Sequence, residues 1–397
     1  MIEYKKNIFF DKVKLNFFLE KIDLPLYIYN YKKIIFNFFF IKKLKFFFFY
    51  SVKSNDNIFL LKLINNFFFK FDIVSIEELK KIILISKKKP FIVFSGSGKN
   101  LSEILISLNL KIFSINIESI QEILKLYYLK KKYKKNINIM IRINPNIDAK
   151  THKKITTGTN LNKFGINLFH LKNLFYLNKI LKFNILGYDF HIGSQLTKIN
   201  PLKKLLKLIN ILYINKKYKY LDIGGGLGVN YYFNKNIINF YKYYNQIYLL
   251  IKKYNLKTKI IIEIGRYIFC NSCVIISKSN YIKFYKKIFF CINKLGMNDV
   301  LRPSLYNSFH KIESLNLGKN TSFFFGPICE SSDKFLSKKI KVKNNSLLIF
   351  YSMGSYCKTM SNNYNSKKKI FEVIICNNKI KIIFKKEKFK NLINNYE

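Results

Sequence analysis

The sequence predicts an α/β architecture: a (β/α)8 TIM barrel followed by a smaller, mainly β domain. Eight short apolar runs recur between residues 45 and 266, and longer, lysine-studded apolar patterns separate them. Strands that alternate with helices are typical of a parallel sheet buried on both faces, and eight such strands are the number that closes a barrel. Each run ends in polar residues, which a barrel would bring together at the carboxyl ends of its strands.

The eight predicted strands lie near residues 45–53, 70–75, 91–96, 112–119, 137–145, 185–194, 220–226 and 260–266. Their ends carry groups that can react or hold a ligand, in chain order Lys53, Asp72 with Ser75, Ser95 with Gly96, Asn116 with Glu118, Arg142, His191 with Ser194, the turn of Gly224, Gly225 and Gly226, and Glu263 with Arg266. Chance would give two or three such endings, whereas a full set predicts one site at the carboxyl mouth of the barrel.

The alternation of strand and helix patterns ends near residue 280. The segments SLLIFYSMGSY, IFEVIICNN and KIKIIF have the pattern of strands, and Asn, Ser and Lys turns separate them without helical patterns between. We therefore expect a barrel over residues 26–280 and a β-sandwich-like domain over residues 281–397 that includes residues 1–25. A chain of 397 residues is long enough to bury a core in each domain.

The formal net charge of +49 does not predict a polyanionic partner here, although such an excess usually would. Lysine is interleaved with Ile, Asn, Phe and Tyr along the whole chain, so the charge reflects a compositional bias rather than a patch or a tail. The phenylalanine-rich segment 36–49 is interrupted by three lysines and is too charged to span a bilayer. It has the pattern of a helix end followed by a buried strand. We expect neither nucleic acid nor a membrane as a partner.

The cysteines predict no metal site. Cys270 and Cys273 form a C-x-x-C pair, but no second pair and no cluster of histidines follows it. The sequence opens with lysines that alternate with apolar residues rather than with a secretory signal. We therefore expect reduced thiols and a cytoplasmic location.

Only three of the 71 basic residues are arginine: Arg142, Arg266 and Arg302. A guanidinium can bind a carboxylate or a phosphate through two parallel hydrogen bonds, which an ammonium group cannot do. In a chain that favours lysine so strongly, the three arginines predict positions where lysine would fail.

Three motifs together predict a pyridoxal phosphate site. Lys53 in YSVKSND offers an amine that can attack an aldehyde, and LDIGGGLG at residues 221–228 offers glycines whose N–H groups can surround a phosphate. Glu263 in EIGR can hold a ring nitrogen in its protonated form, and His191 in FHIGSQ offers a flat ring for stacking. Each motif has a plainer alternative: a snorkelling or ion-paired lysine, a tight structural turn, an ion pair between the acid and the arginine of EIGR, and a hydrogen-bonded core histidine.

Longer stretches resemble the diaminopimelate decarboxylases, a family of alanine-racemase-like (fold type III) pyridoxal phosphate enzymes. The matching stretches are YSVKSN, FDIVSIEEL, IRINPNIDAKTHKKITTGTNLNKFGI, GYDFHIGSQLT, LDIGGGLGVNY, EIGR, LGMNDVLRPSLYNSFH, GPICESSD and YNS, and they extend from residue 50 to residue 366. The resemblance implies the decarboxylation of meso-2,6-diaminopimelate to L-lysine, the last step of lysine biosynthesis, by a homodimer.

The resemblance also implies roles for the matching residues. Pyridoxal 5'-phosphate would be held by Lys53, His191, Ser194, Gly224, Gly225, Gly226, Glu263, Gly265, Arg266 and Tyr364. The substrate would be bound by Arg266, Arg302, Tyr306, Glu330 and Tyr364. The catalytic groups would be Lys53, His191, Glu263 and Cys329, with Cys329 as the proton donor. Cys329 and Glu330 would reach the site of the other subunit.

Three positions depart from the family pattern: Ile264 replaces the proline of Glu-Pro-Gly-Arg, Lys294 replaces an aspartate, and Ile76 replaces a glycine. The alternatives are a basic amino acid decarboxylase of the ornithine or arginine type, an amino-acid racemase of the same fold, and a non-catalytic pyridoxal phosphate carrier. Arg302 argues against the first, because those substrates lack a second carboxylate. Glu263 argues against the second, because a racemase favours a basic partner for the ring nitrogen. The long C-terminal domain argues against the third.

Overall fold

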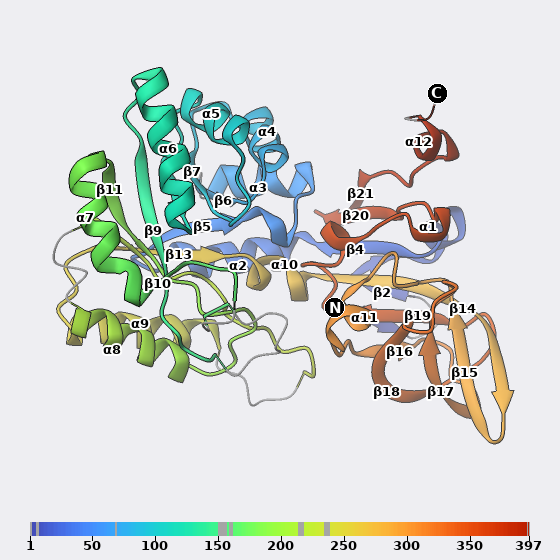
Figure 1. Cartoon of the computed structure of the whole chain (residues 1–397). Coiled ribbons are helices and arrows are strands. Elements are labelled where there is room, and N and C mark those ends of the chain that lie inside the picture. Colours follow the sequence, from blue (N-terminus) through green and yellow to red (C-terminus); the bar gives the residue numbers. More distant parts are fainter. Residues whose placement is uncertain are drawn as a thin grey trace. The chain divides into compact units, whose positions relative to one another are not determined.

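The computed structural model describes residues 2–4, 8–67, 70–149, 157–158, 162–212, 218–233, 239–394 and 396 (Figure 1). The chain forms two compact units. The barrel unit comprises Phe40–Val229 and Lys235–Gly265, and the sheet unit comprises Met1–Phe39, Asn230–Asn234 and Arg266–Glu397. Most of the motif THKKITTGTNL falls outside the described residues.

Eight parallel strands close into a barrel in the barrel unit, as the sequence predicts. They are β5 (Phe47–Ser51), β6 (Lys70–Ile73), β7 (Phe91–Phe94), β8 (Ser114–Ile117), β9 (Asn138–Asn144), β11 (Asn184–Asp189), β12 (Tyr220–Asp222) and β13 (Lys259–Ile264). Each strand pairs in parallel with the next one, and β13 pairs with β5, so the sheet closes on itself. The short strand β10 (Ile166–Asn167) pairs with β9 in addition.

Helices cover the outside of the barrel strands (Figure 1). They are α3 (Ile58–Phe67), α4 (Ile76–Ile85), α5 (Leu101–Asn109), α6 (Ile120–Tyr133), α7 (Leu171–Leu181), α8 (Asn200–Leu212) and α9 (Phe240–Lys253). Polar caps begin several of them: Ser75 and Ser119 each accept a hydrogen bond from a backbone N–H of the first turn, and Asn100 forms a capping box with Glu103. Such caps define where each strand-to-helix loop ends.

Apolar side chains fill the interior of the barrel. Phe49, Val93, Met140 and Ile261 come from four different strands and form a cluster in which no member is more than 2 % exposed. Side chains two residues apart on a strand face the same way, so Glu263 points inward from the same face of β13 as Ile261. The polar groups at the strand ends therefore lie above an apolar floor.

The sheet unit is mainly β, as the sequence predicts for the C-terminal part. Its larger sheet runs in the order β18 (Lys334–Val342), β17 (Asn320–Phe325), β15 (Ile288–Asn293), β14 (Cys273–Tyr285), β4 (Leu26–Asn30), β20 (Phe371–Cys376) and β21 (Lys379–Phe384). Strand β19 (Leu347–Tyr351) pairs with β14 and with β16 (Ile312–Ser314). A smaller sheet contains β1 (Ile2–Tyr4), β2 (Ile8–Phe10) and β3 (Val13–Lys14).

Short helices and one apolar core complete the sheet unit. The helices are α1 (Asn16–Lys21), α10 (Arg266–Phe269), α11 (Arg302–Tyr306) and α12 (Phe389–Ile393), while α2 (Tyr31–Lys42) runs across the boundary between the units. In the core, Ile8, Phe10 and Leu15 pack with residues from the strands that follow, such as Val274 and Ile349. The N-terminal residues thus share a core with the C-terminal strands.

The predicted barrel boundaries at residues 26 and 280 differ from the observed division. Residues 26–39 and 266–280 belong to the sheet unit, because β4 pairs with β14 and with β20. The run LYIYN has the pattern of a buried strand in either unit. Its pairing partners lie more than 200 residues away, so the local sequence cannot indicate which sheet it joins.

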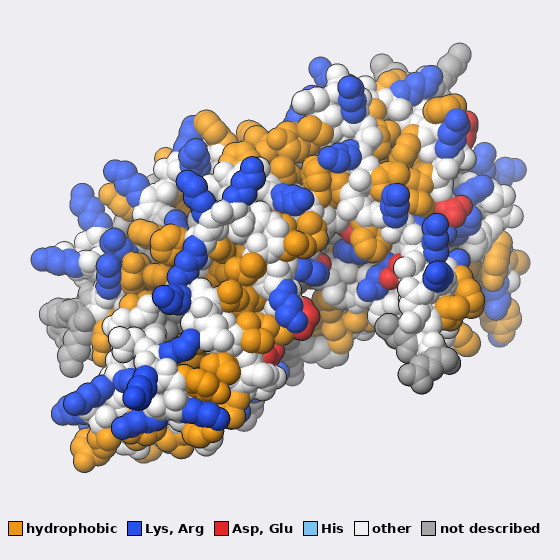
Figure 2. Space-filling view, turned by 90° about the horizontal axis from the view of Figure 1, so that it is seen from above, with side chains coloured by type: hydrophobic (Ala, Val, Ile, Leu, Met, Phe, Trp, Pro, Cys, Tyr) orange, Lys and Arg blue, Asp and Glu red, His pale blue; other side chains and the backbone are white. Residues whose placement is uncertain are grey.

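Basic side chains are spread over the surface. In Figure 2 lysine and arginine side chains are interspersed with apolar ones across the visible face, and acidic side chains are few. Among the described residues, we find no helix with the length and apolar character of a membrane span. The segment 36–49 contains the end of α2 and most of β5, as predicted.

Gly187 on β11 provides a test of the barrel register. A Cβ at this position would lie 1.9 Å from the carbonyl oxygen of Tyr220 on the paired strand. We expect Gly187→Ala to lower the free energy of unfolding by about 1–3 kcal/mol, measured by urea denaturation. Gly98→Ala is the matched control, because nothing lies within 4 Å of a Cβ there. Equal stability of the two variants would contradict the register.

Candidate active site

Lys53 lies directly after β5, in a 3-10 turn formed by Val52–Ser54. Its amine is 3.2 Å from Oδ2 of Asp72, a buried residue of the neighbouring strand β6. The Lys53 side chain is 34 % exposed, so the amine remains accessible although it is paired with an acid. The ion pair that the sequence left open as an alternative is therefore present, and it directs the amine to the carboxyl end of the barrel.

The turn after β12 depends on its glycines. Gly224 and Gly226 have φ angles of +69° and +102°, a region that side chains of L residues rarely adopt. A Cβ on Gly225 would lie 2.2 Å from the carbonyl oxygen of Glu263, so the middle glycine lets the turn pass directly against β13. Successive backbone N–H groups in such a turn form a concavity that suits an anion.

The loop after β11 packs against this glycine turn. The N–H of Leu196 donates to the carbonyl of Gly226 at 2.7 Å, and the N–H of Gly228 donates to the carbonyl of Leu196 at 2.9 Å. A Cβ on Gly226 would lie 2.2 Å from the carbonyl oxygen of Gly193. The structure thus brings Ser194 beside the glycine turn, although the two are about 30 residues apart in the sequence.

Three carboxylates meet inside the barrel. Asp189 ends β11, Asp222 ends β12 and Glu263 lies on β13; all three are buried, and one oxygen of each lies within 4.8 Å of the others. Burial raises the pKa of Asp189 to about 6. Burial, followed by the repulsion of neighbouring carboxylates, raises the pKa values of Asp222 and Glu263 well above their ordinary range. Burial in the barrel interior therefore favours the protonated forms of these acids.

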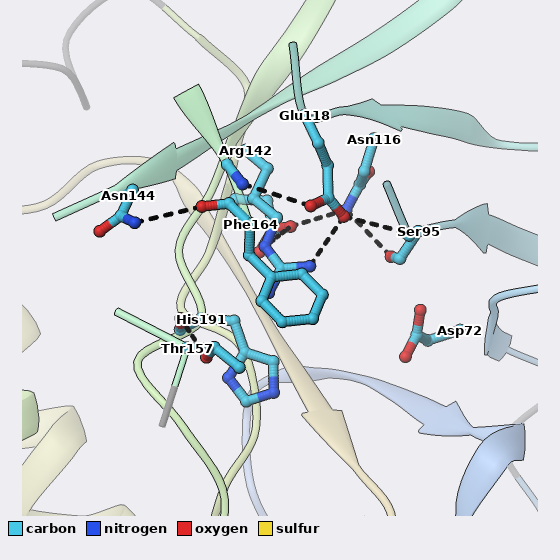
Figure 3. A network of polar contacts seen from close by, with 12 residues as sticks. Asp72, Ser95, Asn116, Glu118, Arg142, Asn144, Thr157, Phe164 and His191 are labelled. Atoms are coloured by element: carbon cyan, nitrogen blue, oxygen red, sulfur yellow. Dashed lines mark hydrogen bonds and ion pairs between the residues drawn. The ribbon is translucent and has the colours of Figure 1, made fainter. Parts of the chain in front are cut away.

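Arg142 on β9 is the centre of a polar network (Figure 3). Its Nη1 lies 2.9 Å from Oε1 of Glu118, and its Nε lies 3.8 Å from Oδ2 of Asp189. The guanidinium also lies over the ring of Phe164, 4.9 Å from the centroid. Asn116 donates to the same oxygen of Asp189 at 3.0 Å. One planar cation thus contacts two buried acids and an aromatic ring at once, and a lysine lacks the flat, rigid set of donors that this arrangement uses.

His191 follows β11 and is partly buried. Thr157 donates a hydrogen bond to its carbonyl oxygen at 2.8 Å (Figure 3). Desolvation, and then the positive charges of Arg142 and Lys53, lower the pKa of His191 well below its ordinary value. The imidazole is therefore neutral at physiological pH, which suits a ring that stacks rather than one that carries charge.

Within the sheet unit, Arg266 and Arg302 share Tyr231. Arg266 donates to the Tyr231 hydroxyl at 2.6 Å, and the guanidinium of Arg302 lies 4.7 Å from the centroid of the same ring. Nη1 of Arg302 lies 3.0 Å from Nε2 of His310. Arginine can only donate, so Nε2 accepts and Nδ1–H donates to the carbonyl of Tyr351 at 3.0 Å.

His310 is neutral in this arrangement. Burial, and then the charge of Arg302, lower the pKa of His310 to about 3. A neutral acceptor orients the guanidinium without cancelling its charge, and no described carboxylate forms an ion pair with Arg302. Arg302 therefore keeps its positive charge for an anionic ligand.

The motifs GPICESSD, RPSLY and YNS lie together in the sheet unit. The hydroxyl of Ser304 donates to the carbonyl of Ser332 at 2.7 Å, and the N–H of Cys329 donates to Oδ1 of Asn365 at 3.0 Å. Tyr306 ends α11 and is partly buried. Cys329, Glu330 and Tyr364 are exposed in the single chain.

Each unit thus gathers one part of the predicted site. The barrel unit contains Lys53, His191, Ser194, Gly224, Gly225, Gly226, Glu263 and Gly265, and the sheet unit contains Arg266, Arg302, Tyr306, Cys329, Glu330 and Tyr364.

Comparison with known proteins agrees with this arrangement. The family model described as "Pyridoxal-dependent decarboxylase, pyridoxal binding domain" matches residues 37–270. The chain belongs to the pyridoxal-dependent decarboxylases. It is 35% identical to diaminopimelate decarboxylase of Campylobacter jejuni, over 94% of this chain and 96% of that protein.

Solved structures of diaminopimelate decarboxylases resemble this decarboxylase over nearly the whole chain. The structure from Helicobacter pylori complexed with L-lysine matches with a TM-score of 0.85 and 33% identity, covering 95% of this chain and 98% of that one. The structure from M. jannaschii in co-complex with L-lysine matches with a TM-score of 0.90 and 28% identity, covering 100% and 98%.

Two acids that lie close to Glu263 were not predicted from the sequence. Asp189 and Asp222 each lie within a predicted strand, in GYDF and LDIG, and end the observed strands β11 and β12, yet neither was expected to take part in the site. The available signal was an acid inside an apolar run of a chain that has only 22 acidic residues. A buried acid requires a partner or a proton, so such a position indicates a polar interior.

We expect that lysine cannot replace Arg142. Arg142→Met leaves Glu118 and Asp189 buried without a cation and should cost about 3–5 kcal/mol of unfolding free energy, whereas Arg142→Lys should lose about 1–3 kcal/mol. Urea denaturation of the full chain measures both. Lys125→Met, an exposed position on α6, is the control and should stay within about 0.5 kcal/mol. An Arg142→Lys variant as stable as the original protein would contradict the role given to the guanidinium.

Proposed function

We propose that this protein uses pyridoxal 5'-phosphate to decarboxylate meso-2,6-diaminopimelate to L-lysine. The observation that carries the proposal is the full-length similarity to diaminopimelate decarboxylases together with the convergence of an amine, a glycine turn and a buried acid at one end of the barrel. The first part indicates the substrate, and the second indicates the cofactor.

The residues of the barrel unit fit this cofactor. Lys53 has an accessible amine that can attach the cofactor's aldehyde carbon. The glycine turn and Ser194 offer donors for its phosphate, and Glu263 offers an acid for its ring nitrogen. The neutral ring of His191 suits stacking. When bound, pyridoxal phosphate supplies an electron sink for the bond that breaks.

Asp72 keeps the Lys53 amine in place. The 3.2 Å ion pair holds the amine at the end of β5 until a carbonyl carbon arrives. Whenever Lys53 is not attached to the cofactor, Asp72 would hold its amine within reach of the site.

Substrate recognition is assigned to the sheet unit. Diaminopimelate carries a second amine and a second carboxylate. Arg302, held by neutral His310, would bind the far carboxylate with Tyr306, and Glu330 would bind the far amine. Arg266 and Tyr364 would contact both substrate and cofactor. A decarboxylase for ornithine or arginine needs the acid alone.

Cys329 would complete the reaction. The carboxylate at the reacting carbon leaves as carbon dioxide, and the thiol of Cys329 donates a proton to that carbon. Cys329 and Glu330 are exposed in the single chain, which supports their delivery to the partner subunit's site in a homodimer. Six free thiols also support a reducing, cytoplasmic location.

Borohydride reduction tests the attachment to Lys53. We expect that reducing the protein loaded with pyridoxal phosphate leaves a pyridoxyl group on Lys53, detected by peptide mass spectrometry. The same preparation before reduction should convert meso-diaminopimelate to lysine and carbon dioxide. Lys53→Ala should lose adduct and turnover, whereas the exposed Lys62→Ala should keep both. An adduct on another lysine would refute the site.

Arg302→Met tests substrate choice. We expect kcat/KM for meso-diaminopimelate to fall about 100-fold, because a charge-assisted pair of hydrogen bonds is lost. The affinity for pyridoxal phosphate should stay within about threefold, measured by fluorescence titration. Arg302→Lys keeps the charge, so its kcat/KM should lie between that of Arg302→Met and that of the original protein. Equal losses of turnover and of cofactor affinity would contradict the assignment.

A further inference from the structure

Asp222 contacts two parts of the candidate cofactor site. Its Oδ1 accepts a hydrogen bond from the N–H of Gly224 at 2.8 Å, so the side chain shapes the glycine turn. Its carboxylate also lies within 4.8 Å of those of Glu263 and Asp189. The residue is fully buried. No step of the reaction described above uses it.

The cations of the barrel interior are engaged elsewhere. Lys53 pairs with Asp72, and Arg142 pairs with Glu118 and Asp189. Within the described residues, neither Asp222 nor Glu263 has a cation at ion-pair distance, and the second oxygen of Asp222 has no hydrogen-bond partner. Two buried carboxylates this close cannot both be ionised without a large cost.

We propose that Asp222 is a positioning residue that links the phosphate turn to Glu263, with one carboxylate oxygen holding the Gly224 N–H and the other sharing a proton with Glu263. This inference rests on the proposed cofactor site. The shared proton leaves one negative charge for the pair, so Glu263 can present that charge to a ring nitrogen while Asp222 stays neutral. A neutral Asp222 also avoids repelling a phosphate bound at the same turn.

The charged and titratable groups around Asp222 favour this state. At the carboxyl ends of the barrel strands they include Asp72 on β6, Glu118 after β8, Arg142 on β9, Asp189 on β11, His191 after β11, Glu263 on β13 and Lys53 after β5. Five of these eight groups, counting Asp222, are carboxylates, while His191 is neutral. The raised pKa of Asp222, caused by burial and then by Asp189, agrees with a retained proton.

The shared proton determines how stability depends on pH. An acid whose pKa is raised in the folded protein binds its proton more tightly there than in the unfolded chain. The stability that this proton contributes is fully present below the pKa of the acid in the unfolded chain, which is about 4. It is lost as the pH rises toward the pKa of the acid in the folded protein. The cofactor-free protein should therefore lose stability as the pH rises above about 4.

Asp222→Asn and Asp222→Ala separate the two roles. Asparagine keeps the oxygen that accepts from Gly224 but cannot lose a proton, so Asp222→Asn should bind pyridoxal phosphate within about threefold of the original protein. Its melting temperature should fall less as the pH rises above about 4. Asp222→Ala should show the same weaker pH dependence and about tenfold weaker binding of pyridoxal phosphate, because the turn loses its hydrogen bond.

Two outcomes would overturn the inference. One is an Asp222→Asn variant with the pH dependence of the original protein, since Asp222 would then hold no proton. The other is an Asp222→Ala variant that binds the cofactor as tightly as Asp222→Asn, since the turn would then not depend on the side chain. These measurements require no turnover. Failure to decarboxylate diaminopimelate would therefore refute the proposed function alone.

Infrared spectroscopy of the full chain gives a second readout. A protonated carboxylic acid has a carbonyl stretching band that a carboxylate lacks. We expect a band at neutral pH that Asp222→Asn removes. If this variant does not fold, Glu263→Gln removes the other member of the pair and keeps the Gly224 bond, and it should weaken the same band. Absence of the band from the original protein would also overturn the inference.

Discussion

The candidate active site depends on the pairing of β13 with β5, which closes the barrel. In this register Glu263 lies opposite Phe49 and Ile264 lies opposite Tyr50, so the acid on the last strand and the lysine after the first strand occupy the same end of the sheet. The two positions are far apart in the sequence. Only the closure of the barrel brings them close together. The apolar cluster of Phe49, Val93, Met140 and Ile261 lies below this polar end of the interior.

Charge inside the barrel is opposite to charge outside it. The chain carries 71 basic and 22 acidic residues, yet the charged groups at the strand ends are mostly carboxylates, and lysines are spread over the face that Figure 2 shows. A buried acid is costly unless it is paired or protonated. Retaining several of them in so basic a chain indicates a function that needs negative charge or protons in the interior, such as holding a protonated ring nitrogen.

The eight strands could be predicted from the sequence because two independent patterns coincide in the same segments. The apolar runs have strand length, and each ends in a polar group, as at Lys53 and His191. The domain boundaries were harder to predict, because the local sequence of β4 fits either sheet and its partner strands are far away in the chain. Asp189 and Asp222 were not singled out as site residues for a similar reason: only the closed barrel brings their carboxylates together with Glu263.

The departures from the family pattern leave these contacts in place. Ile264 is 2 % exposed and continues the ladder of β13 beside Tyr50, so the alternation of the strand still turns Glu263 inward. A Cβ on Gly265 would lie 3.0 Å from Cβ of Ser54, so glycine lets the chain pass beside the turn that carries Lys53. Ile76 begins α4 directly after its cap Ser75 and is buried, and Lys294 is exposed. A β-branched residue in place of proline therefore extends a strand that already points the acid correctly. For this reason the EIGR variant keeps Glu263 on the inward face of β13.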